Sequence, residues 1–174
     1  MQRILILLLL FISLNNYGQD MVYERGSVDF GLGAVISVGL QEEAGFDIRF
    51  QYTNSTKIKA VIAEYNRFFV KEFENTQVYN ELAASYNLRL FNWETLSITA
   101  GVGYVVNDYK VLSRARDTST LFFSTGDVNH AGFLKLRGLY NITTPIHVFV
   151  ELNLKSFGKR YDTFIFGLTY SLGI

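Results

Sequence analysis

Alternation of apolar and polar residues limits this chain to a structure built from two-faced strands. Between Ser27 and Tyr52, two strand-length runs joined by Gln41–Glu43 place an apolar side chain at every second position. Successive side chains of a β-strand point to opposite faces, so each run has one apolar and one polar face. Similar runs follow near 57–70, 78–90, 95–106, 128–140, 146–155 and 163–172. The sequence therefore predicts an all-β protein of eight strands.

The first 19 residues have the features of a secretory signal peptide. Arg3 precedes the apolar run Ile4–Leu14, which is too short to cross a bilayer as a helix. We expect cleavage near Gly18 or Gln19, which leaves one domain over residues 20–174. An uncleaved anchor is the alternative. Because the chain has no cysteine, the exported domain has no disulfide framework and no thiolate ligand for a metal.

The number of strands and the lengths of their connections indicate a membrane barrel. An even number of antiparallel strands of about ten residues is the signature of bacterial outer-membrane barrels, whose periplasmic turns are short and external loops long. With the N-terminus in the periplasm, turns at Asn54, Trp93 and Thr144 fall inside, and the long segment Asn107–Asp127 falls outside. We therefore predict an eight-stranded antiparallel up-and-down transmembrane β-barrel in the outer membrane of a Gram-negative bacterium.

Two shorter connections complete this outline, a polar link over Lys71–Thr76 and a turn over Asn141–Pro145. The main alternative fold is an exported soluble barrel of lipocalin type, since it also has eight strands with a period of two. Its apolar face would point inward rather than toward lipid.

Aromatic residues near the predicted strand ends are typical of the girdles that membrane barrels place at the bilayer interfaces. We expect Tyr52, Trp93, Tyr140 and Tyr170 at one interface, and Phe69, Tyr104 and Phe164 at the other. Outer-membrane lipids are therefore the first expected partners. The near-zero net charge gives no reason to expect nucleic acid as a partner.

Charged residues on the predicted inner faces balance one another. Eight strands enclose room only for side chains or one small ligand, and buried charges must be paired. The acidic members are Asp29, Asp47, Glu64, Glu81 and Glu151, and the basic ones are Arg49, Arg89, Lys135, Arg137 and Lys155. We interpret them as a salt-bridged plug; a narrow channel in which Arg and Lys select anions is the alternative.

Catalytic candidates are few. A lipid-modifying barrel enzyme could use His130 as base with Ser124 and Asp127, but their spacing is not specific for catalysis. We therefore predict a protein that is not an enzyme. Neither His130 nor His147 has a partner at metal-ligand spacing, so no metal and no cofactor are expected.

The predicted long external loop mixes basic and apolar side chains. They are Arg114, Arg116, Leu121, Phe122 and Phe123. Two interpretations stay open: a mobile solvated loop that closes a hairpin, or a contact surface for lipid phosphates or a partner protein.

Four segments carry a family resemblance: Ala63–Arg67, Glu81–Tyr86, Gly101–Tyr104 and Gly167–Leu168. With the order and length of the strands, they resemble the small outer-membrane barrels that include the OmpA transmembrane domain and OmpX. Within this class the chain is most similar to the conjugal-transfer TraO family. The resemblance implies a structural component of a conjugal-transfer apparatus, with envelope or conjugation proteins as partners and no catalytic residues. A stand-alone envelope or adhesion barrel is the alternative.

Overall fold

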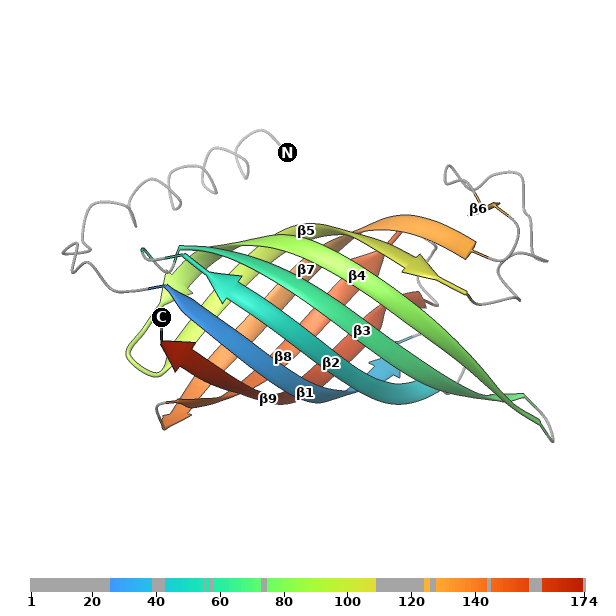
Figure 1. Ribbon diagram of the computed structural model, residues 1–174, viewed down its shortest axis with the longest axis horizontal. Helices are drawn as coiled ribbons and strands as arrows, with labels where there is room; N and C mark the ends of the chain where they lie inside the picture. Colours follow the sequence, from blue (N-terminus) through green and yellow to red (C-terminus); the bar gives the residue numbers. More distant parts are fainter. Residues whose placement is uncertain are drawn as a thin grey trace, which may run out of the picture.

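The computed structural model describes residues 26–38, 43–54, 56, 58–72, 75–108, 124–125, 128–143, 145–156 and 161–173, nearly all of them in strands (Figure 1). The strands are β1 (Ser27–Ser37), β2 (Glu43–Thr53), β3 (Lys59–Glu72), β4 (Asn75–Asn92), β5 (Leu96–Asn107), β6 (Ser124–Thr125), β7 (Val128–Thr143), β8 (Ile146–Lys155) and β9 (Thr163–Gly173). The predicted segment 1–19 lies outside the described residues.

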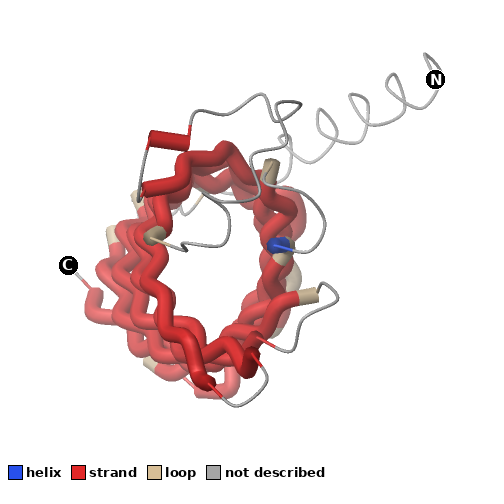
Figure 2. Tube along the Cα trace, turned by 90° about the vertical axis from the view of Figure 1, so that its right-hand side faces the viewer, coloured by secondary structure: helices blue, strands red, loops and turns tan. Residues whose placement is uncertain are grey.

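The eight long strands close on themselves. Each pairs antiparallel with its neighbours in the order β5-β4-β3-β2-β1-β9-β8-β7, and β5 also pairs with β7. The view along the axis shows the resulting ring (Figure 2). The two-residue β6 pairs with β7 at Val128 and Asn129 and takes no part in the closure. The predicted fold, an eight-stranded antiparallel up-and-down barrel, is therefore confirmed.

The strands are strongly tilted. A path through directly paired residues that begins at Ser27 passes Thr53 on β2 and Lys135 on β7, and it returns to β1 at Ser37. This offset of ten residues is the shear of the barrel. For eight strands it corresponds to a tilt of about 40° from the axis.

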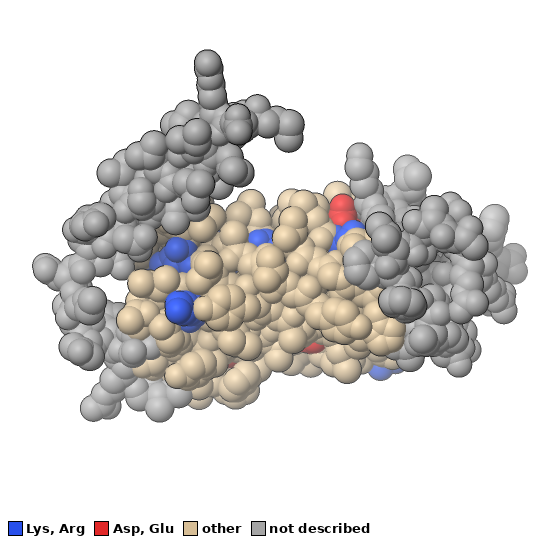
Figure 3. Space-filling view, turned by 90° about the horizontal axis from the view of Figure 1, so that it is seen from above, with Lys and Arg blue, Asp and Glu red and all other residues tan. Residues whose placement is uncertain are grey.

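The barrel has its apolar face outside. On β1 the outward Phe30 and Leu32 are 52% and 67% exposed, whereas the inward Asp29 is 6% exposed. Charged atoms interrupt the barrel surface at only a few points in the space-filling view (Figure 3). A lipocalin-type barrel has the opposite arrangement, so that alternative is wrong. Among the described residues, no helix is long and apolar enough to cross a membrane.

The apolar belt has a measurable height on β3. Exposed basic residues mark its two edges, Lys59 near the end where β1 begins and Arg67 toward the opposite end. Between them the outward positions hold Val61, Ala63 and Tyr65. Eight residues of tilted strand rise by about 20 Å, close to the apolar band of about 25 Å that outer-membrane barrels present to lipid.

The ends of several strands differ from the sequence prediction. The polar link expected over Lys71–Thr76 is wrong, because β3 and β4 continue in register to Glu72 and Asn75. The turn expected over Asn141–Pro145 is shorter than predicted, since β7 runs to Thr143 after an irregularity in its pairing with β8. Polar residues are typical of turns, but in a hairpin that extends beyond the apolar belt they can remain in the paired strands.

Further corrections concern single residues at strand ends. The first strand was expected to reach Leu40 and ends at Ser37, and the third was expected from Lys57 and begins at Lys59. Glu43, predicted in a connection, is the first residue of β2. Within the expected loop Asn107–Asp127, Asn107 belongs to β5 and residues 124–125 form β6.

The belt predicts a depth profile for charge insertion. Leu32 lies midway along β1 and Val28 lies on the same face near its start. In phospholipid vesicles, we expect Leu32→Arg to lower the free energy of unfolding by about 2–4 kcal/mol, because it places a charge in hydrocarbon. Val28→Arg should cost about 0–1 kcal/mol. Urea unfolding followed by tryptophan fluorescence measures both, and equal costs would contradict the position of the belt.

Candidate functional site

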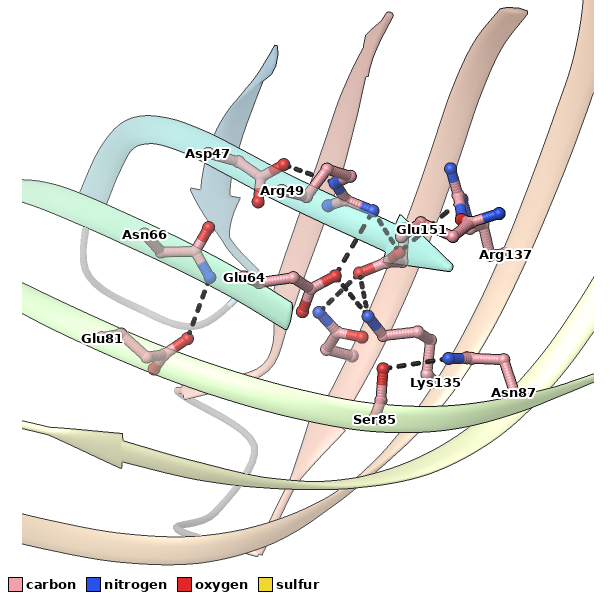
Figure 4. Close-up of polar contacts among 12 residues, drawn as sticks. Asp47, Arg49, Glu64, Asn66, Glu81, Ser85, Asn87, Lys135, Arg137 and Glu151 are labelled. Atoms are coloured by element: carbon pink, nitrogen blue, oxygen red, sulfur yellow. Dashed lines mark hydrogen bonds and ion pairs between the residues drawn. The ribbon is translucent and has the colours of Figure 1, made fainter. Parts of the chain in front are cut away.

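The inner faces of β2, β3, β7 and β8 bring charged side chains together in the lumen (Figure 4). Arg49 is at the centre of this group. Its Nε lies 2.6 Å from Oδ1 of Asp47, and its Nη1 lies 2.7 Å from Oε2 of Glu151 and 3.3 Å from Oε1 of Glu64. These side chains are fully shielded from solvent. Arg49 therefore links three strands, two of which lie across the lumen from each other.

Two further basic residues come from β7. Lys135 pairs with Glu64 and lies 3.0 Å from Oε1 of Glu151. Arg137 donates from Nη1 to Oε1 of Gln51, and its Nε is 4.0 Å from Oε2 of Glu151. The central cluster of Asp47, Arg49, Glu64, Lys135, Arg137 and Glu151 thus contains three acidic and three basic groups.

The cluster extends toward β1 through a hydrogen-bonded amide. Gln51 donates from Nε2 to Oδ2 of Asp29 at 2.9 Å while its Oε1 accepts from Arg137. An amide can donate and accept at once, so it connects an acidic and a basic group that are not in direct contact. Asp29 is therefore joined to the cluster indirectly.

Small and aromatic residues shape the space around Arg49. A Cβ atom at Gly31 would lie 2.5 Å from Cγ of Arg49, so this position on β1 must lack a side chain for Arg49 to lie across it. The guanidinium carbon of Arg49 is 3.9 Å from the ring centre of Phe149, and that of Arg137 is 5.0 Å from the same ring. Cation–π attraction to this ring adds to the ion pairs of both guanidinium groups.

A second ion pair lies closer to the end of the barrel where the β5–β7 connection is located, here named the long-loop end. Lys155 Nζ is 2.7 Å and 2.8 Å from the two carboxylate oxygens of Glu81. Asn66 donates to the same carboxylate at 3.3 Å. The lumen therefore holds charged groups at two levels.

Apolar residues fill much of the remaining lumen. One cluster comprises Val35, Phe68, Val70, Tyr79, Phe149, Tyr161 and Ile165, and a smaller one comprises Val105, Ala131 and Phe133. Phe68 and Tyr79 stack with ring centres 4.6 Å apart, and Tyr79 donates its hydroxyl proton to Glu43 at 2.9 Å. These apolar side chains therefore share the interior of the barrel with the ion pairs.

The structure places the ten charged residues of the predicted plug in three locations. Six form the central cluster, Asp29 joins it through Gln51, and Glu81 and Lys155 form the second pair. Arg89 is half-buried beside the irregularity in the pairing of β4 with β5, between Arg89 and Phe91. The sequence indicated a common face for these residues, but not their partners.

Sequence reasoning gave no role to Glu43, Gln51, Phe68 and Phe149, which all lie in the lumen. On β2, Glu43 and Gln51 each lie an even number of residues from Asp47, so the two-residue alternation alone places their side chains on the same inward face. Only the alternation along β8 distinguishes Phe149 from a lipid-facing aromatic residue, because its neighbour Val150 takes the outward position.

The seven aromatic residues of the predicted girdles lie on the outer surface. Their exposed fractions are 48% for Tyr52, 42% for Phe69, 54% for Trp93 and Tyr104, and 50% for Tyr140 and Tyr170, while Phe164 is half-buried. Their role at the bilayer interfaces stays a prediction.

The catalytic candidates are not assembled in the described part of the chain. His130 faces outward, and its Nδ1 lies 2.7 Å from the hydroxyl of Tyr104. Ser124 pairs through its backbone with Asn129, and Asp127 lies outside the described residues. The loop residues Arg114, Arg116, Leu121, Phe122 and Phe123 also lie outside them. Within the described ranges, no three His, Asp or Glu residues are placed to hold a metal ion.

Known structures share this architecture. Ail, the attachment invasion locus protein of Yersinia pestis, matches with a TM-score of 0.54 at 11% identity, covering 87% of this chain and 100% of Ail. The N-terminal β-barrel domain of Pseudomonas aeruginosa OprF matches with a TM-score of 0.52 at 9% identity, covering 86% and 98%. The designed protein TMB2.3 matches with a TM-score of 0.51 at 14% identity, covering 88% and 100%.

No protein-family model and no curated protein matches the sequence. The resemblance to the TraO family therefore stays a prediction. At identities this low, the structural matches show the fold alone, that of a small closed barrel with eight strands.

Proposed function

We propose that this protein is a closed β-barrel of the Gram-negative outer membrane that acts through its surfaces, as a structural component, rather than by conduction or catalysis. The observation that carries the proposal is the central cluster of six charged residues, whose side chains are at most 4% exposed. Mutually paired charges that leave no solvated surface are better suited to closing a lumen than to passing ions.

The distribution of polarity supports the outer membrane as the location. The outer surface is apolar over nearly the height of the band that outer-membrane barrels present to lipid, and the polar side chains point inward. In water an apolar surface of this extent would cause association. A closed barrel also leaves no unpaired strand edge in lipid.

A finer proposal is a role in conjugal transfer, which rests on the resemblance of four segments to the TraO family. A barrel closed by paired charges suits such a role, since a structural subunit needs a rigid body in the membrane and contact surfaces at its ends. The stand-alone envelope or adhesion barrel is the second candidate, and it is supported by the same fold.

The closed lumen predicts the electrical behaviour of the purified protein. In planar bilayers, we expect no steady conductance from the wild type. Arg49→Ser combined with Phe149→Ala removes two side chains that cross the lumen, and should produce frequent openings. Phe50→Ala, on the opposite face of β2, is the matched control and should remain silent. A steady ohmic current through the wild type would contradict closure and support the narrow pore.

The ion pairs predict a thermodynamic coupling. Lys135→Met leaves Glu64 and Glu151 without one of their partners, and should lower the free energy of unfolding by about 3–5 kcal/mol. Adding Glu64→Gln removes the uncompensated charge, so the double variant should be more stable than Lys135→Met by about 1 kcal/mol or more. Urea titrations in vesicles, read by the heat-modifiable shift in gel migration, give both values. Additive effects would show that the two groups are not coupled.

The conjugation proposal predicts a genetic phenotype. Deleting the gene from its mobile element should reduce transfer to a recipient strain, and a plasmid copy should restore it. Neighbouring reading frames should encode other transfer proteins. Unchanged transfer frequency in the deletion strain would eliminate this role and leave the stand-alone envelope barrel.

A further inference from the structure

The outer surface has an apolar groove that the proposed function does not use. It has a volume of about 470 Å³, within the usual range for ligand pockets, and lies over β4, β5, β7 and β8. Among the residues that line it are Leu88, Ala100, Val102, Leu134, Leu136 and Leu154. Ala100 forms part of its floor, because its single methyl group is shorter than the side chains around it.

The groove can continue toward the long-loop end. Gly132 is the next outward position after Leu134 on β7, and it pairs with Tyr104 on β5. A Cβ atom at Gly132 would meet only the carbonyl oxygen of Gly103, at 3.8 Å. The space over Gly132 is therefore open.

A polar pair stands at the end of this path. The Tyr104 hydroxyl and His130 Nδ1 are 2.7 Å apart, and the two rings are tilted by 32° with centres 5.9 Å apart. This bond fixes the orientation of the imidazole, whose Nε2 makes no hydrogen bond to any described residue. The described part of the chain therefore leaves Nε2 without a hydrogen-bond partner. Rows of paired residues run obliquely around the barrel, and from β3 to β7 they move toward the long-loop end. His130 therefore lies at about the level of Arg67, at the edge of the apolar belt nearer the long-loop end.

We propose that this groove binds a phosphorylated lipid of the external leaflet, with an acyl chain in the groove and a phosphate oxygen hydrogen-bonded to His130. The inference rests on the proposed location, since a groove in the lipid-facing belt is filled by hydrocarbon. An apolar cleft that leads to an oriented polar pair at the bilayer edge matches an amphiphile. Tyr104 acts as the residue that positions the imidazole.

Lipid retention by the full mature protein in dodecyl maltoside tests the proposal, with diphosphoryl lipid A as probe and native mass spectrometry as readout. We expect one lipid A bound per wild-type barrel. His130→Ala should weaken binding about ten-fold, since it removes a hydrogen bond to a charged group. Tyr104→Phe should weaken it less, and Ala100→Phe, which fills the groove, should abolish it.

Two controls separate the site from general effects. Ala63→Phe adds the same bulk to the outer face of β3, away from the groove, and should leave retention unchanged. Arg67→Ala removes an exposed cation of the same belt edge and should also leave it unchanged. Equal retention by His130→Ala and the wild type would overturn the proposal, as would an equal loss in Arg67→Ala.

Two further outcomes would assign the groove to another occupant and overturn the proposal. One is equal retention of phosphatidylglycerol and lipid A. The other is a wild-type dimer that Ala100→Phe dissociates. Heat-modifiable migration of every variant reports the membrane barrel independently, so a barrel that folds in vesicles without retaining lipid would refute this site and leave the proposed function standing.

Discussion

The ion pair of Arg49 with Glu151 joins β2 to β8 across the lumen, and the interior is arranged around it. In a lipid environment the outward Leu and Phe side chains gain little from touching one another, because the surrounding hydrocarbon is equally apolar. The free energy that favours one arrangement of the interior must therefore come from backbone pairing and from contacts inside the lumen. Arg49 supplies the contact that connects β2 to β8 directly, and Gly31 leaves the room for it.

The same cluster explains why one pairing register is preferred over others. The charged partners come from four strands, and a slip of one residue in any of these strands would turn its charges toward lipid. A slip of two residues would keep the face but separate Lys135 from Glu64. The ion pairs thus penalise both errors, and backbone hydrogen bonds alone cannot distinguish the second.

The sequence allowed us to predict which side chains point inward and which outward, since the alternation of apolar and polar residues on β1 and β2 is nearly unbroken. Strand ends were harder, because Lys71 and Thr76 look like turn residues but pair across a hairpin. Partners in the lumen could not be predicted at all. Whether Arg49 meets Glu151 depends on the shear of the closed barrel, which is set by all eight registers together. The Tyr104–His130 pair was missed for a related reason, since the two residues become neighbours only when β5 and β7 close the ring.

A shear of ten for eight strands also fixes the width of the lumen, and width decides which residues can close it. A short acidic or hydroxylated side chain on one wall cannot reach the axis, so the residues that meet there are Arg, Lys, Glu and Phe. Inside this barrel the length of a side chain therefore matters as much as its charge. Two substitutions that conserve charge are unequal here: exchanging one long basic residue for the other keeps a group at the axis, whereas shortening Glu151 by one methylene moves its carboxylate back toward the wall.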